Sequence, residues 1–111
     1  ALDALTYELA SLYGPSNIRV VAINPGAIDT GLSDDLAGDA ERTTTVRRFS
    51  EDMVMLRRWA TADELARFIV AMAGDDASYL TGTTIMIDGG WLRQRLPLSV
   101  RQKAYPEDFP S

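Results

Sequence analysis

Apolar residues recur at helical spacing at the start of the chain. The positions lie three or four residues apart, and a Gly-Pro pair at Gly14 and Pro15 then gives a helix stop signal. They are Leu2, Leu5, Leu9 and Leu12. No Ser, Thr, Asp or Asn precedes the first turn as a cap. The pattern predicts the second part of a longer helix that begins before Ala1. A frayed helix whose start was processed away is the alternative.

Two runs have the composition of β-strands. Residues 18–24 carry a continuous apolar run from Val20 to Ile23, which is typical of a strand covered on both faces in a parallel sheet. Residues 83–88 form the second run, which ends at a pair of glycines. Between the two runs, residues 61–64 (Thr-Ala-Asp-Glu) predict a capping box for a helix that ends near Gly74.

The remaining segments are polar and lack a strong period. Residues 31–59 predict an excursion with one or two short helices, and residues 92–111 predict a tail. The order of helix, strand, excursion, helix and strand predicts an α/β fold with parallel strands and a right-handed crossover. Ligands of such sheets bind beyond the carboxyl ends of the strands.

The first strand ends in an unusual way, at Pro25 and Gly26. Proline cannot donate to the strand ladder, so Pro25 helps to end it. Glycine allows unusual torsions, so Gly26 lets a flat ligand come close. Ile28 and Thr30 follow at the rim, where backbone amides and a hydroxyl can meet a polar ligand. An ordinary turn is the alternative, and Pro-Gly more often forms one.

Composition narrows the function classes. The net charge of −5 argues against a nucleic-acid binder, which would carry a basic face. The chain has no histidine and no cysteine, so we predict no metal site of these ligands and no thiolate catalysis. Its apolar runs are too short to span a membrane, and no signal peptide opens the chain. We therefore expect a cytoplasmic protein, and the excess of arginine over lysine agrees with a GC-rich bacterial source.

Three segments together resemble the C-terminal half of the short-chain dehydrogenase/reductase family. Residues 1–10 (ALDALTYELA) look like the helix that carries the catalytic Tyr-x-x-x-Lys of the family at its start. Residues 18–30 (IRVVAINPGAIDT) are similar to its sixth strand and the Pro-Gly motif after it. Residues 57–90 look like its last helix and final strand, which ends in Asp-Gly-Gly. One departure is Val21, where the family often has asparagine.

The resemblance implies one partial domain over residues 1–111, the C-terminal half of a Rossmann-like doubly wound parallel sheet. It implies NAD or NADP as cofactor, with Pro25 and Gly26 beside the nicotinamide, the Ile28 backbone on the carboxamide, and Thr30 on the carboxamide or pyrophosphate. Residues 31–59 would be the substrate lid. Its expected substrate-facing residues are Leu32, Met53 and Met55. The Asp88–Gly90 turn is expected to be structural.

The catalytic set of the family is not found in these residues. No tyrosine is followed by lysine at the Tyr-x-x-x-Lys spacing, and Lys103, the only lysine, lies in the tail. The glycines form no dinucleotide-binding loop. We therefore predict no catalytic residue here and do not expect these residues to bind the cofactor on their own.

Two functions remain open from the sequence. The first is part of an NAD(P)-dependent oxidoreductase that interconverts an alcohol and a carbonyl. The second is a non-catalytic, truncated remnant that acts as an oligomerisation or interaction module. In both cases the strand at residues 18–24 would expose an apolar edge. We expect a complementary N-terminal half or a partner chain to cover that edge, in a homo-oligomer. The sequence separates neither NAD from NADP nor one substrate from another.

Overall fold

The computed structural model describes residues 1–32 and 38–110, which form two compact units. Unit 1 comprises Ala1–Pro25 and Asp63–Ile87, and unit 2 comprises Gly26–Ala62 and the segment that begins at Asp88. Each unit is described by itself. The lid expected over residues 31–59 lies in unit 2, and its residues 33–37 are outside the described residues.

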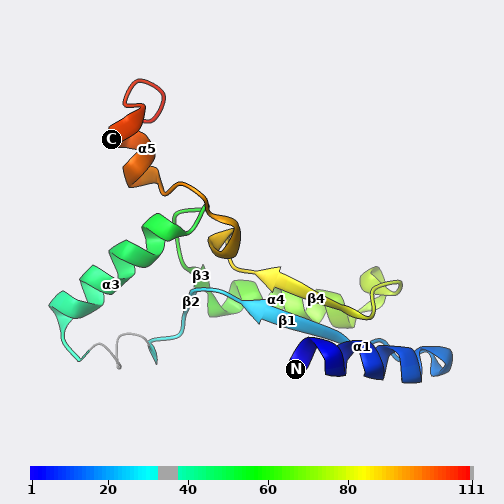
Figure 1. Ribbon diagram of the computed structural model, residues 1–111. Coiled ribbons are helices and arrows are strands. Elements are labelled where there is room, and N and C mark those ends of the chain that lie inside the picture. The colour runs from blue at the N-terminus through cyan, green and yellow to red at the C-terminus, as the bar shows by residue number, and fades with distance from the viewer. Residues whose placement is uncertain (33–37, 111) are drawn as a thin grey trace. The chain divides into compact units, whose positions relative to one another are not determined.

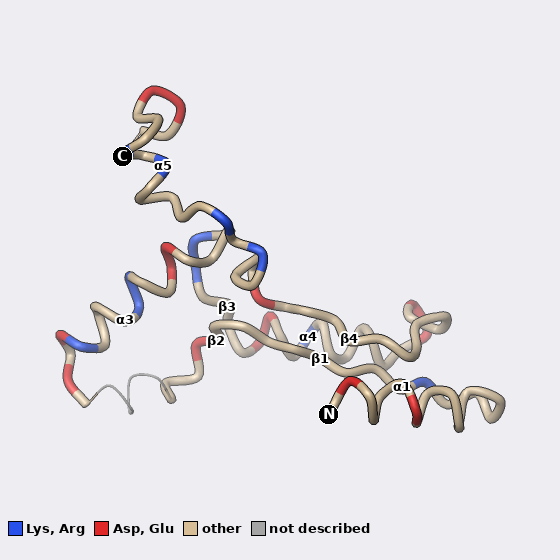
Figure 2. Tube along the Cα trace, viewed as in Figure 1, with Lys and Arg blue, Asp and Glu red and all other residues tan. Residues whose placement is uncertain are grey.

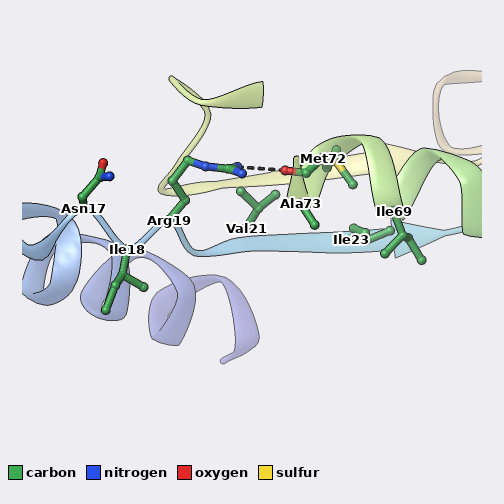
Figure 3. A pocket seen from close by; sticks show the side chains of 8 residues that line it. All are labelled: Asn17, Ile18, Arg19, Val21, Ile23, Ile69, Met72 and Ala73. Atoms are coloured by element: carbon green, nitrogen blue, oxygen red, sulfur yellow. Dashed lines mark hydrogen bonds between the residues drawn. The ribbon is translucent and has the colours of Figure 1, made fainter. Parts of the chain in front are cut away.

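Unit 1 is built on a pair of parallel strands. Strand β1 (Val21–Pro25) pairs with β4 (Thr83–Ile87) in a register that places Val21 opposite Thr83 and Pro25 opposite Ile87. Helix α1 (Leu2–Tyr13) lies on one face of the pair, and α4 (Ala62–Ala73) lies on the other (Figures 1 and 3). The predicted α/β fold with parallel strands is confirmed. Ala10 and Ala22 are buried between helix and sheet, as is Met72 of α4.

The first α-helix ends at Tyr13, directly before the predicted stop signal at Gly14 and Pro15, which is confirmed. Gly14 keeps right-handed torsions, with φ −55°, and the chain continues through a 3-10 turn at Gly14–Ser16. The left-handed residue that ends this turn is Asn17, with φ 59°. Asparagine tolerates this conformation better than most side chains do, so Asn17 can end the 3-10 turn that follows α1.

Strand β1 begins later than expected, at Val21 instead of Ile18, because the residues before it have other partners. The Val20 amide donates to the Thr81 hydroxyl at 3.0 Å, and the Val20 carbonyl accepts from Gly82 at 2.9 Å. The Arg19 guanidinium donates to the Met72 carbonyl at 2.8 Å and to the Gly74 carbonyl at 3.1 Å. The Met72 carbonyl lies in the last turn of α4, where the helix leaves it without a partner, and the Gly74 carbonyl also accepts from the Ala77 amide at 3.2 Å.

Beside this arginine, β1 and α4 border an open cavity of about 520 Å³ (Figure 3). Val21 and Ile23 of β1 and Ile69 of α4 line it. Within the described residues, β1 pairs only with β4, so its other edge has no strand neighbour there. An apolar strand edge of this kind recruits a further strand or segment.

Unit 2 contains two short parallel strands, β2 (Ile28–Asp29) and β3 (Ala60–Thr61), and Ile28 is opposite Ala60. Helix α3 (Ala40–Met53) precedes β3 in the chain, and α5 (Leu98–Ala104) lies in the tail after a 3-10 turn at Trp91–Arg93. Neither the β2–β3 pairing nor α5 was predicted. No helix among the described residues is both long and apolar enough to cross a membrane.

Helix α3 is a single helix of 14 residues, longer than the short helices expected. Asp39 caps it, since its carboxylate accepts from the Arg42 amide at 2.8 Å. Ser50 is its buried residue, and the Ser50 hydroxyl donates to the Val46 carbonyl of the same helix. The helix has few apolar positions, which is why hydrophobic periodicity did not reveal it.

The junction after α3 is the best-buried point of unit 2. Val54 is 1% exposed. A Cβ on Gly89 would lie 2.7 Å from a Val54 methyl group, and Gly89 also has φ +61°. The Leu56 amide donates to the Gly89 carbonyl at 3.1 Å. Glycine is therefore required at position 89 for both conformation and space.

Helices α3 and α5 are joined by one carboxylate. Asp52 accepts from the Ser99 amide at 3.0 Å and from the Ser99 hydroxyl at 2.6 Å. The hydroxyl bond and then the amide bond lower the pKa of Asp52 below its ordinary value of 3.8, and Arg57 lowers it further, whereas desolvation raises it. Asp52 thus caps α5 from a neighbouring helix.

We predict that Arg19→Met destabilises the protein. Removing the guanidinium leaves the Met72 carbonyl at the end of α4 unpaired, which should lower the free energy of unfolding by about 1–3 kcal/mol. Urea unfolding measures this change. The control is Arg67→Met. Both side chains of the Arg67–Asp63 ion pair are more than two-thirds exposed, so this substitution should lower the free energy of unfolding by less than about 0.5 kcal/mol. Equal effects of the two substitutions would contradict this role of Arg19.

We predict that the link between Asp52 and Ser99 breaks in acid. Because the pKa of folded Asp52 is lowered, the stabilisation is complete above pH 3.8 and is lost as the pH falls below that value. A pH titration of the Ser99 amide proton by NMR should show a midpoint below 3.8. Asp52→Ala should abolish this titration, and Glu41→Ala, at the far end of α3, should leave it intact. A midpoint at or above 3.8 would show that the bonds do not form.

Candidate functional site

The chain after β1 passes very close to the chain after β4. An added Cβ on Gly26 would lie 2.6 Å from the Asp88 Cβ and 2.7 Å from the Asp88 Cα. Real Cβ atoms do not approach backbone so closely, so only glycine fits at position 26. The sequence suggested that Gly26 makes room for a ligand, and the structure adds that it makes room for Asp88.

Asp88 in turn organises the segment that follows it. Its carboxylate accepts from the Gly90 amide and from the Leu92 amide, each at 2.9 Å. These bonds fix the turn that leads into Trp91, as short acidic side chains commonly do. The structural role expected for the Asp88–Gly90 turn is confirmed.

The segment that begins at Gly26, helix α3 and Trp91 border an open cavity of about 500 Å³ in unit 2. Its wall combines backbone, two hydroxyls and a large apolar area. The lining residues are Gly26, Ala27, Ile28, Thr30, Leu32, Val46, Ser50, Trp59 and Trp91. A cavity of this size and composition suits a small organic ligand held by a few polar groups.

The predicted site residues fall into four places. Gly26, Ile28, Thr30 and Leu32 line this one cavity. Pro25 is the last residue of β1 and belongs to unit 1. Met53 is the half-buried last residue of α3 and does not line the cavity, whereas Met55 lines a second cavity in unit 2. Their predicted roles toward a cofactor or a substrate stay predictions.

Sequence reasoning missed the contacts that hold α3 over this cavity. Arg47 of α3 forms an ion pair with Asp29 of β2 at 3.2 Å. The same guanidinium lies 4.5 Å from the centroid of the Trp59 ring. Arg47 therefore bridges Asp29 of β2 and the Trp59 wall of the cavity. The sequence feature that could have indicated this contact is Trp59, the last residue of the 31–59 segment, because an aromatic ring can hold a guanidinium over its face.

Trp59 also carries an unpaired polar atom. Its indole Nε1 is buried and has no acceptor among the described residues. The Thr30 hydroxyl, at the exposed rim, has no partner in the same part of the chain either. Buried donors are normally paired, so the indole N–H is a candidate donor to an oxygen of a bound molecule.

Residues 1–92 match the family model described as enoyl-(acyl carrier protein) reductase. The chain belongs to the short-chain dehydrogenase/reductase family. The resemblance seen in the sequence is therefore confirmed, and the family match ends where the predicted tail begins.

Family relatives match over most of this chain. Protein FixR of Bradyrhizobium diazoefficiens is 44% identical over 90 residues, which are 81% of this chain and 29% of that protein. L-xylulose reductase of Caenorhabditis elegans is 33% identical over 91 residues, which are 82% of this chain and 35% of that protein. The chain thus spans about a third of the length of these relatives.

Solved structures of the family agree. The structure of 4-hydroxyisoleucine dehydrogenase complexed with NADH has a TM-score of 0.70 at 29% identity, covering 85% of this chain and 37% of that chain. The structure of a C-terminal deletion mutant of Thermoplasma acidophilum aldohexose dehydrogenase has a TM-score of 0.74 at 28% identity. The match covers 83% of this chain and 42% of that chain. The Rossmann-like fold of the family is therefore shown for this chain.

We predict that Gly26→Ala is destabilising although alanine is small. The new methyl group must displace Asp88 backbone, so the free energy of unfolding should fall by about 1–3 kcal/mol. Gly14→Ala is the matched control, because no atom lies within 4 Å of its added Cβ and its torsions are helical. Thermal unfolding compares the two. A Gly26→Ala protein as stable as the Gly14→Ala protein would contradict the close approach.

Proposed function

We propose that this chain supplies the nicotinamide-side wall and the substrate lid of an NAD(P)-dependent oxidoreductase that interconverts an alcohol and a carbonyl. One observation carries the proposal: Gly26, Ile28, Thr30 and Leu32, singled out by family position, line one cavity. A family structure of similar fold is a dehydrogenase complexed with NADH.

The donors around the cavity fit a nicotinamide ring with its carboxamide. The ring is flat and apolar, and Trp59 and Trp91 offer apolar surface of matching kind. The carboxamide has one acceptor and two donor hydrogens, and the Thr30 hydroxyl and the Ile28 backbone can serve both. The buried Trp59 N–H is a further donor for an oxygen in this cavity. Bound there, NAD(P)H would supply the hydride.

The other proposed role of the residues around the cavity is to position the ligand and exclude water. Helix α3 lies over the cavity through Val46 and Ser50, and the Arg47–Asp29 pair ties it to the loop that holds Ile28 and Thr30. A lid held in this way shields the reacting atoms from solvent. We propose that the acid–base tyrosine, its lysine and serine, and the glycine loop come from polypeptide outside these 111 residues.

We further propose that the complementary N-terminal half covers the open edge of β1. The cavity beside Val21 and Ile23 has the apolar lining that an added strand would bury. The enzyme would then act as a homo-oligomer in the cytoplasm.

The direct test is the affinity for NADH and for NADPH of the polypeptide that carries these residues. We expect Thr30→Val to weaken binding of the preferred cofactor roughly threefold to tenfold, the equivalent of one neutral hydrogen bond. Thr44→Val is the control, because the Thr44 hydroxyl donates only within α3, to the Ala40 carbonyl at 2.9 Å. Quenching of tryptophan fluorescence reports both affinities.

Two results would count against the proposal. Equal affinity of Thr30→Val and the unchanged protein would remove Thr30 from the cofactor wall. Failure of the longest natural polypeptide to bind either cofactor would favour the non-catalytic interaction module instead.

A further inference from the structure

A second cavity, of about 220 Å³, lies in unit 2 between the loop after α3 and the start of the tail. It is outside the wall assigned to the nicotinamide, and none of its residues lines that cavity. The lining residues are Met55, Arg57, Gln94, Leu96, Leu98 and Arg101. Figure 2 shows basic residues both in the loop after α3 and in the tail segment before α5.

The two guanidinium groups converge on this cavity from separate segments. Arg101 is oriented by a bond from its Nε to the Leu96 carbonyl at 2.7 Å and by the Phe109 ring, 5.6 Å away. Arg57 projects from a residue with φ 62°. Neither guanidinium forms an ion pair among the residues that the structure describes.

The nearest acidic group is already engaged. Asp52 interacts electrostatically with Arg57, but both oxygens of its carboxylate accept hydrogen bonds from Ser99. The cavity therefore keeps two positive groups whose hydrogen-bond capacity is not used by a carboxylate of this part of the chain. Guanidinium groups with this geometry bind carboxylates and phosphates.

Two further observations indicate the chemical class of the ligand. The Gln94 Oε1 is buried and has no donor among the described residues, so a ligand that carries a hydroxyl would satisfy it. Met55, Leu96 and Leu98 give the cavity an apolar side, which suits carbon rather than a bare inorganic anion.

We propose that this cavity binds a short aliphatic hydroxycarboxylate, with its carboxylate between Arg57 and Arg101 and its hydroxyl donating to Gln94. The site is independent of the proposed cofactor wall but adjoins it along the chain. An added Cβ on Gly90 would lie 2.5 Å from the Met55 sulfur, and the next residue, Trp91, lines the larger cavity. A bound acid would therefore rest against the turn that also shapes the cofactor side.

The test is calorimetric titration of the purified protein, without nucleotide, with 3-hydroxypropionate. We expect saturable binding that weakens about tenfold or more in Arg57→Gln and in Arg101→Gln, since each removes a charged hydrogen-bond partner. Arg95→Gln, an exposed tail residue that does not line the cavity, should bind as the unchanged protein does.

The proposed hydrogen bond from the ligand hydroxyl to Gln94 is tested by comparing two ligands. Propionate should bind more weakly than 3-hydroxypropionate, and Gln94→Leu should remove that difference. 1,3-Propanediol, which has no charge, should not bind.

Melting temperatures establish that the variants are folded. Arg57 is exposed, and its guanidinium donates no hydrogen bond to the described residues, so Arg57→Gln tests the site even if Arg101→Gln unfolds. No saturable binding, or binding unchanged in Arg57→Gln, would overturn the site. Inorganic phosphate binding as tightly as 3-hydroxypropionate would overturn the ligand class. None of these results depends on whether the protein binds NAD(P)H.

Discussion

The close approach of Gly26 to Asp88 is the constraint on which the candidate site depends. The parallel register places Pro25 opposite Ile87 at the ends of β1 and β4, and the next residues are Gly26 and Asp88. Without a Cβ at position 26, the two segments can remain side by side beyond the ladder. Asp88 then fixes the following turn through the Gly90 and Leu92 amides. One missing methyl group therefore determines where both walls of the site begin.

Helix α3 depends on this framework through a small number of polar contacts. The Arg47–Asp29 pair is only partly buried, with side-chain exposures of 30% and 48%, and such pairs contribute little free energy alone. The stacking of the same guanidinium on Trp59 adds to it. At the other end, Asp52 holds the first turn of α5. A helix fastened by exposed polar contacts can move away at low cost, as the proposed substrate lid requires.

Part of this fold could be predicted from the sequence, and the rest could not for identifiable reasons. The apolar run from Val20 to Ile23 and the β-branched run that ends at Ile87 predicted parallel strands, because burial on both faces demands such runs. The strand start was wrong because Arg19 is bound to carbonyls at the end of α4, a contact between residues more than 50 positions apart. Helix α3 is largely exposed and so left little hydrophobic pattern.

The candidate site also contains residues that the sequence could predict and residues that it could not. Gly26, Ile28 and Thr30 follow one another in a motif and could be found by position. The roles of Arg47, Trp59 and Trp91 arise from tertiary contacts between segments that share no local pattern. Met55 lines the second cavity, because the chain turns at Val54 and directs the next side chain toward Gly90, and its predicted role toward a substrate stays a prediction.

The measurement that tests the central claim most directly is a crystal structure, with NADH, of the longest natural polypeptide that carries these residues. The account predicts the nicotinamide in the cavity of Gly26, Ile28 and Thr30, with its carboxamide within hydrogen-bond distance of the Ile28 backbone or the Thr30 hydroxyl. A nicotinamide bound elsewhere, with this cavity filled by other segments of the protein, would contradict it.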